Sequence, residues 1–198
     1  PELFNSWVDS LSEAADMEIG DFSDYLLALR KRHAFFHEQG CRLADHGITN
    51  FVAEQYASSE IESVFGNLRA GKEAGREEVL KFQSAMLHEF GLMNAEKGWV
   101  QQYHYGCMRN NNTRMFEKAG PDTGFDSIGD FATARAMSKF FDRLDYKGRL
   151  AKTIIYNLNP CDNELVATML GNFQDGSVPG KMQMGSAWWF LDQKDGME

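Results

Sequence analysis

The sequence lacks an excess of basic residues. Its 20 lysines and arginines are outnumbered by 29 aspartates and glutamates, which gives a formal net charge of -9 at pH 7. Because nucleic-acid binding relies on clustered lysine and arginine that displace counterions from phosphates, this balance argues against a nucleic-acid partner. It leaves room for a small anionic substrate that individual arginines could bind.

Cysteines and long apolar runs are also scarce. Cys41, Cys107 and Cys161 lie far apart without a CxxC pair, so the sequence indicates neither a disulfide framework nor a zinc knuckle. No stretch reaches the roughly 20 apolar residues of a membrane-spanning helix, and there is no signal-peptide pattern. We therefore expect a protein of the reducing cytoplasm without a membrane partner.

The sequence contains no GxGxxG motif after a predicted strand and no Walker loop, which argues against the usual nucleotide-binding folds. What it does contain is an alternation of strands and helices. Strands are predicted at "CRLADHG", "GWVQQYHYG", "KTIIYNLN" and "KMQMGSAWW", and helices at residues 21–37, 52–65, 77–96 and 131–144 and at "CDNELVATMLG". Such alternation favours right-handed crossovers and a parallel sheet, and without nucleotide loops it favours a barrel.

The predicted fold is therefore α/β, a partial (β/α)8 TIM-type barrel of parallel strands with outer helices. A complete barrel has eight strands and typically about 250 residues, whereas four strands are visible here. The chain opens on Pro1 and stops at "DQKDGME", which reads like the first turn of a helix. We expect residues 1–198 to be a single segment of such a barrel, with the rest lying beyond both ends.

Several residues predict where helices begin. Asp21 is expected to cap the first predicted helix, and Asp130 the helix at residues 131–144. Pro160 suits the first position of the helix that follows it. The run of residues 110–112, three asparagines, can cap the next helix and form Asx turns, which is its expected structural role.

The stretch "QQYHYGCMRNNNTR" places unusual polar chemistry at the end of a strand. Alternation puts Gln102, His104 and Gly106 on one face and aromatic residues on the other. Such a polar face is unusual in a buried strand unless it looks into a cavity. The polar residues near the strand ends are Asp45 and His46, His104 and Arg109, Asn157 and Asn159, and Ser186 and Trp188. In a barrel this end carries the chemistry, although strand ends are also polar because loops begin there.

Other polar residues can be explained by a structural role instead of a role in binding or catalysis. His33 and His37 in "HAFFH" have a spacing that suits a metal on one helix face, but they lack the glutamate of HExxH and precede a strand. We expect them, and His88 in a long amphipathic helix, to be structural. Arg109 could bind a carboxylate through two hydrogen bonds or pair with acidic neighbours.

Four longer blocks occur in the order that a known family has. They are "RKRHAFFHEQGCRLADHG", "GWVQQYHYGCMRNNNTRMFEKAGPDTGFDSIGDF", "LNPCDNELVATMLGNFQDG" and "GSAWWFLDQKDGM". Together they closely resemble the uronate (glucuronate) isomerase family of the amidohydrolase superfamily. The resemblance covers nearly the whole chain and is weakest over residues 51–75, which we expect to be a variable helical insertion. It implies an aldose-ketose isomerase of uronate catabolism that interconverts D-glucuronate with D-fructuronate and D-galacturonate with D-tagaturonate.

The resemblance also implies roles for individual residues. Asp45 and His104 are the implied catalytic residues, and Arg42 and Trp188 are implied substrate-binding residues. Arg109, a candidate carboxylate-binding residue from the sequence pattern itself, is also expected to bind substrate. His104 falls at the superfamily's fifth-strand histidine, so it is a candidate ligand for a divalent metal, expected to be zinc in the intact enzyme. The expected small-molecule partner is a hexuronate, and a homo-oligomer stays an open alternative.

Part of the family's machinery is missing from these residues. The paired histidines of the superfamily, HxH, do not occur, and the last-strand aspartate would fall after Glu198. We therefore expect this chain alone to be inactive and to bind no metal tightly, with the activity belonging to the intact parent. Two alternatives stay open, a metal-dependent hydrolase of the same superfamily and a non-catalytic half-barrel.

Overall fold

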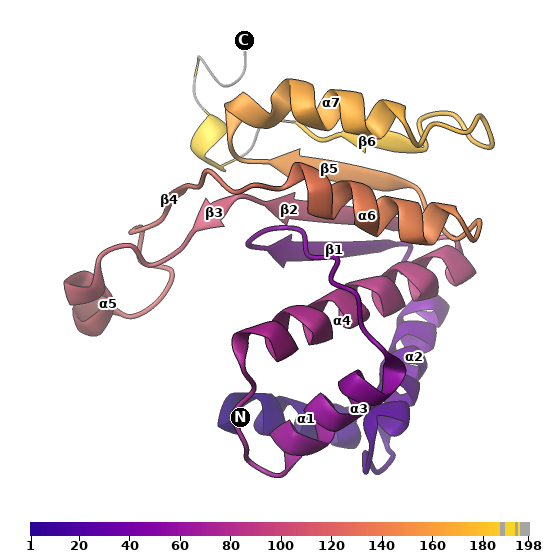
Figure 1. Cartoon of the computed structure of the whole chain (residues 1–198), viewed down its shortest axis with the longest axis vertical. Coiled ribbons are helices and arrows are strands. Elements are labelled where there is room, and N and C mark those ends of the chain that lie inside the picture. The colour runs from indigo at the N-terminus through magenta and orange to yellow at the C-terminus, as the bar shows by residue number, and fades with distance from the viewer. Residues whose placement is uncertain (187–188, 193, 195–198) are drawn as a thin grey trace.

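The computed structural model describes residues 1–186, 189–192 and 194. Its main sheet has four parallel strands in the order β1 (Leu43–Ile48), β2 (Val100–Tyr105), β5 (Thr153–Asn157) and β6 (Met182–Met184). Neighbouring strands in this order pair in parallel register. Figure 1 shows helices lying along this sheet. The predicted parallel α/β arrangement with outer helices is confirmed.

Seven α-helices and a small second sheet complete the described part. The helices are α1 (Glu2–Ala15), α2 (Phe22–Glu38), α3 (Ser58–Arg69), α4 (Arg76–Lys97), α5 (Thr113–Ala119), α6 (Ala134–Asp145) and α7 (Asn163–Gly171). Short 3-10 turns span η1 (Pro160–Asp162) and η2 (Trp189–Leu191). Strands β3 (Cys107–Met108) and β4 (Ser127–Ile128) pair antiparallel, and α5 lies between them on an arm that extends away from the body (Figure 1).

One face of the main sheet packs against α4, α6 and α7. Alternation in β2 and β5 sends Tyr103, Tyr105 and Ile155 to this face, where all three are buried. They join apolar side chains of the three helices, among them Phe140 and Val166, in one core. Because burial of apolar surface is the main stabilising term in folding, this core fixes which face of the sheet stays uncovered by these helices.

A second core joins α1, α2 and α3 to α4, and we call this part the helical lobe. Its buried residues include Val8, Leu11, Tyr25, Phe65 and Met86. The lobe lies below the sheet in Figure 1. The sequence patterns did not predict helix α1. No helix among the described residues is long and apolar enough to cross a membrane.

The expected helix starts are partly confirmed. The side chain of Asp21 accepts a hydrogen bond from the backbone of Asp24 and caps α2. Pro160 occupies the first turn of η1, which leads into α7. The side chain of Asn112 caps α5 by accepting from Met115 N.

Two expected helix starts are wrong. Residues 52–57 are not helical, because Phe51 and Ala53 are buried in the sheet core, and α3 begins only at Ser58. Asp130 does not cap α6, which begins at Ala134. The segment that precedes α6 is instead held at Gly129. The N–H of Gly129 donates to Gly106 O, and its carbonyl accepts from the side chain of Asn159. The variability expected of residues 51–75 stays a prediction.

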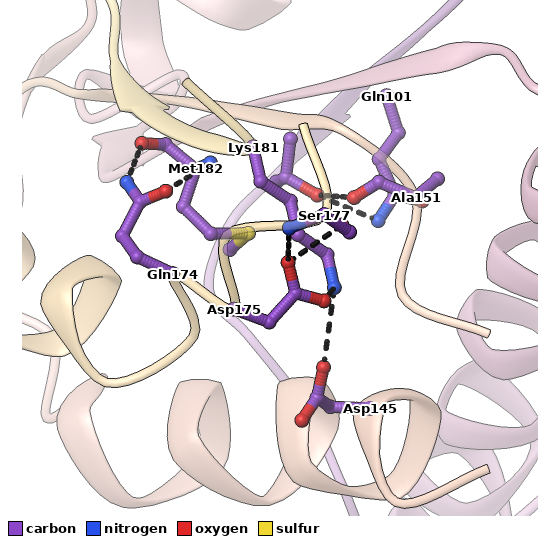
Figure 2. A network of polar contacts seen from close by, with 9 residues as sticks. Gln101, Asp145, Ala151, Gln174, Asp175, Ser177, Lys181 and Met182 are labelled. Atoms are coloured by element: carbon purple, nitrogen blue, oxygen red, sulfur yellow. Dashed lines mark hydrogen bonds and ion pairs between the residues drawn. The ribbon is translucent and has the colours of Figure 1, made fainter. Parts of the chain in front are cut away.

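A buried lysine ties together the elements at the amino end of the sheet (Figure 2). The side chain of Lys181, only 8% exposed, donates to Asp175 at 2.5 Å and lies 3.4 Å from Asp145 at the end of α6. The carboxylate of Asp175 also accepts two hydrogen bonds from Ser177. The hydrogen bond from Lys181 is the largest cause of a lowered pKa for Asp175. This network joins α6, the loop after α7 and the start of β6.

Candidate active site

Asp45 and His104 meet on the sheet face opposite the helical core. Asp45 lies in β1 and His104 in β2, one strand across and two residues further along the register. Asp45 Oδ1 and His104 Nδ1 are 2.7 Å apart, and the two side chains are 58% and 21% exposed. Because a carboxylate can only accept, this contact assigns the Nδ1 proton to the imidazole. Two predicted site residues from different strands are therefore in direct contact.

A small cavity lies at the carboxyl ends of β1, β2 and β5, next to His104. Its volume is about 140 Å³, and its lining includes Gly47, Thr49, His104, Cys107, Arg109 and Leu158. Burial raises the pKa of the Cys107 thiol, so this group stays protonated at neutral pH and is a poor nucleophile. The polar chemistry of the cavity therefore comes mainly from His104 and Arg109.

Arg109 pairs with acidic neighbours, which was one of the two roles expected for it. Its guanidinium lies 3.2 Å from Asp122 and 3.3 Å from Asp126, both on the arm that carries α5. It also lies over the ring of Trp189, 4.9 Å from the ring centroid. Since Arg109 still lines the cavity and is half exposed, these contacts hold it in place without removing it from the cavity wall.

The structure does not bring Arg42 to this pair through any described contact. Arg42 precedes β1, and its guanidinium donates to the carbonyls of His37 and Cys41, near the end of α2. Trp188 lies outside the described residues. A substrate-binding role for these two residues stays a prediction.

The asparagines at the end of β5 and just after it have structural roles. Asn157 donates to Asn159 O and to the side chain of Asn163 at the start of α7. Asn159 caps η1 by accepting from Cys161 N. Together with the hydrogen bond from the Asn159 side chain to Gly129 O, these bonds engage both side-chain amides and support the structural explanation of this polar strand end.

The histidines on the helix side of the sheet are also packed. His33 stacks on Trp99, and His37 accepts a hydrogen bond from the indole N–H of the same residue. His88 is buried in α4, where desolvation lowers its pKa to about 4. His46 stacks between Phe90 and Tyr103, and burial lowers its pKa as well. None of these four is among the residues lining the cavity beside His104.

Comparison with known proteins identifies the family. Residues 1–198 match the family described as glucuronate isomerase. A uronate isomerase from Bacteroides fragilis is 63% identical over all 198 residues. The chain belongs to the glucuronate isomerase family. It spans 42% of the length of that relative.

Two solved structures share the fold of this glucuronate isomerase family member. Uronate isomerase from Thermotoga maritima matches 98% of the chain with a TM-score of 0.87 at 27% identity, and the match covers 41% of that protein. Glucuronate isomerase from Caulobacter crescentus matches 96% with a TM-score of 0.82 at 26% identity, covering 38% of that protein. The predicted partial barrel is thereby confirmed.

The described residues do not form a complete metal site. No group of three or more His, Cys, Asp or Glu side chains in the described ranges is arranged to hold a metal ion. Asp45 and His104 are two suitable donors in contact, whereas a catalytic zinc site generally has three protein ligands. The described residues therefore do not fit a complete metal centre by themselves.

Tyr156 is a neighbour of His104 that the sequence did not predict as a site residue. This residue of β5 stacks on His104, with ring centroids 4.2 Å apart and 10° between the ring planes. A signal for it existed, because alternation in "TIIYN" places Ile154 and Tyr156 on the face opposite Ile155. Finding it from sequence required the register between β2 and β5, which pairs His104 with Tyr156.

Proposed function

We propose that the full-length protein is an aldose-ketose isomerase that converts D-glucuronate to D-fructuronate and D-galacturonate to D-tagaturonate. One observation in the structure carries this proposal, the contact between Asp45 and His104 beside a cavity at the carboxyl ends of the strands. In barrel enzymes that end of the sheet bears the chemistry. Membership of the glucuronate isomerase family names the reaction.

The reaction moves a proton between two neighbouring carbons of the sugar and needs a group that stabilises the enediolate. Asp45 is suited to keep the His104 proton on Nδ1, which makes the other ring nitrogen, Nε2, the basic one. A carboxylate partner of this kind fixes the tautomer and the orientation of the ring. We propose that His104 acts through Nε2 on the substrate or on a group that binds it.

A hexuronate also carries a carboxylate that must be bound. We propose Arg109 for this contact, since it lines the same cavity as His104 and its planar guanidinium can make two parallel hydrogen bonds. Its pairing with Asp122 and Asp126 would pre-orient the group. Arg42 and Trp188 are kept as further substrate contacts, on the family resemblance alone.

We propose that His104 supplies one ligand of a divalent metal, zinc being the proposed ion, and that residues outside this chain supply the others. Such an ion would polarise the sugar carbonyl when bound. The proposed location is the cytoplasm, and a homo-oligomer stays a prediction. No observation favours the alternative of a hydrolase.

The test is an assay of the full-length protein with D-glucuronate and D-galacturonate, followed by proton NMR of the products. We expect the matching ketouronate to form without uptake of water, and we expect activity to fall after treatment with a chelator. Hydrolysis of an amide or ester substrate without isomerisation of either uronate would contradict the proposal. If a chelator leaves the activity unchanged, the metal is no longer part of the proposal.

A further inference from the structure

Tyr156 forms a flat wall beside the imidazole of His104. The two residues are partners in the parallel register of β2 and β5, so their side chains project from the same face of the sheet. Their rings are nearly parallel, 10° apart, at a centroid distance of 4.2 Å. Asp45 holds the edge of the same imidazole at Nδ1. The ring of His104 is therefore held on a flat side and on one edge by residues of two different strands.

Gly185 limits where the ring of Tyr156 can lie. The N–H of Gly185 donates to Ile155 O at 2.8 Å, which places this glycine beside Tyr156 just after β6. A Cβ atom at position 185 would overlap ring carbons of Tyr156. The phenol ring thus occupies the space between His104 and the backbone after β6, and this arrangement requires a residue without a side chain at position 185.

We infer that Tyr156 is a positioning residue for His104. Its ring keeps the imidazole in the plane from which Nδ1 reaches Asp45, and its hydroxyl is not needed for this task. The inference rests on the proposed function, because it assigns the imidazole a role in uronate isomerisation. Orienting partners of this kind typically change activity by about 10- to 100-fold when they are removed.

The first experiment compares Tyr156→Leu with Tyr156→Phe in the full-length protein, assayed with D-glucuronate. Leucine keeps apolar bulk but removes the flat ring, so kcat should fall on the order of 10- to 100-fold while KM changes little. Phenylalanine keeps the ring and should retain kcat. An equal loss in both variants would assign the role to the hydroxyl, and unchanged kcat in Tyr156→Leu would remove the role; either result overturns the inference.

A double variant tests whether Tyr156 acts through His104. Adding Tyr156→Leu to His104→Ala should cause no further loss of kcat, because the positioned group is already gone. A further loss of the same size as in the single variant would overturn the inference.

Gly185→Ala provides a second approach if Tyr156→Leu does not fold, since the added methyl displaces the same ring from its other side. It should lower kcat with little change in KM, and wild-type kcat in this variant would contradict the inference.

Proton NMR separates failure of this inference from failure of the proposed function. The imidazole protons of His104, assigned by their loss in His104→Ala, lie over the ring of Tyr156 and should show a ring-current shift. Tyr156→Leu should abolish that shift and Tyr156→Phe should keep it, whether or not the protein isomerises uronates. If the wild-type protein is inactive but the shift behaves in this way, the proposed function fails and the positioning of His104 stands. If the shift is the same in all three proteins, the inference fails even when the enzyme is active.

Discussion

Charged side chains at the two ends of the sheet differ in their exposure and in their partners. At the amino end, Lys181 is 8% exposed and two carboxylates surround its ammonium group. At the carboxyl end, Asp45 and His104 share one hydrogen bond, and Asp45 stays 58% exposed beside a cavity. A buried charge needs partners that satisfy it, whereas a group that acts on a substrate must stay accessible. We therefore propose that the amino end contributes stability and the carboxyl end contributes chemistry, as in other barrels.

The largest effect is expected at the carboxyl end. In the full-length protein, His104→Ala should lower kcat for D-glucuronate by at least about 100-fold, the usual size of a lost general acid-base group. His33→Ala and His88→Ala are the controls, since the first stacks on Trp99 and the second is buried in α4. Steady-state kinetics on folded variants provide the measurement. Equal losses in all three would remove His104 from the site.

The opposite behaviour is expected at the amino end. Lys181→Met leaves Asp145 and Asp175 without their shared ammonium group, which should lower the melting temperature by several degrees and leave kcat at 25 °C unchanged. The loss of melting temperature is moderated because Asp145 and Asp175 are both partly exposed to water. The exposed Lys152 is a matched control, and Lys152→Met should melt like the wild type. A wild-type melting temperature for Lys181→Met would mean that the buried network contributes no stability.

A smaller effect is expected for the substrate carboxylate. Arg109→Lys replaces a planar group with a point charge and should raise KM for D-glucuronate about tenfold, with a modest change in kcat. Arg42→Lys makes the same exchange before β1, where the guanidinium donates to backbone carbonyls. If Arg42 binds substrate, its KM should rise as well. If it is structural, only the melting temperature should change, and the pair of variants decides between these roles.

The smallest effect concerns pH. Burial is the main cause that lowers the pKa of His88 from 6.5 to about 4, and Arg143 and Lys147 act in the same direction. Between these pH values the unfolded chain binds more protons at this residue than the folded one, so stability falls as pH drops from about 6.5 towards 4. His88→Leu should therefore lose less melting temperature between pH 7 and pH 5 than the wild type. An identical loss in both proteins would show that His88 contributes nothing to the acid sensitivity.

Sequence patterns predicted the features of the fold and of the candidate site that depend only on residues close together in the chain. Alternation in β2 identified the face that carries His104, because a strand repeats every two residues whatever it packs against. The cap at Asp21 was equally local, since one carboxylate satisfies a backbone N–H three residues ahead. These features need no knowledge of the rest of the fold.

What was missed depends on distant parts of the chain. Helix α3 begins later than expected because Phe51 is buried against the sheet, which overrides local helix propensity. Pairing of Arg109 with acidic residues was expected, but which ones was not, because its partners lie 13 and 17 residues further along and reach it only because the arm folds back. The stack of Tyr156 on His104 requires the register of two strands that are separated by α6 and the arm.

The same register has a kinetic consequence. Leu43 pairs with Val100, Gln101 with Thr153, and Thr153 with Met182, so each strand pairing closes a loop of roughly 30 to 60 residues. Loop closure costs entropy before any contact repays it, which slows the formation of parallel sheets. Helices α1 to α4 follow one another along the chain, with only β1 among them, and their packing closes shorter loops on average. During refolding, the helical lobe should therefore gain protection from hydrogen exchange before the sheet, and the contact between Asp45 and His104 should form among the last.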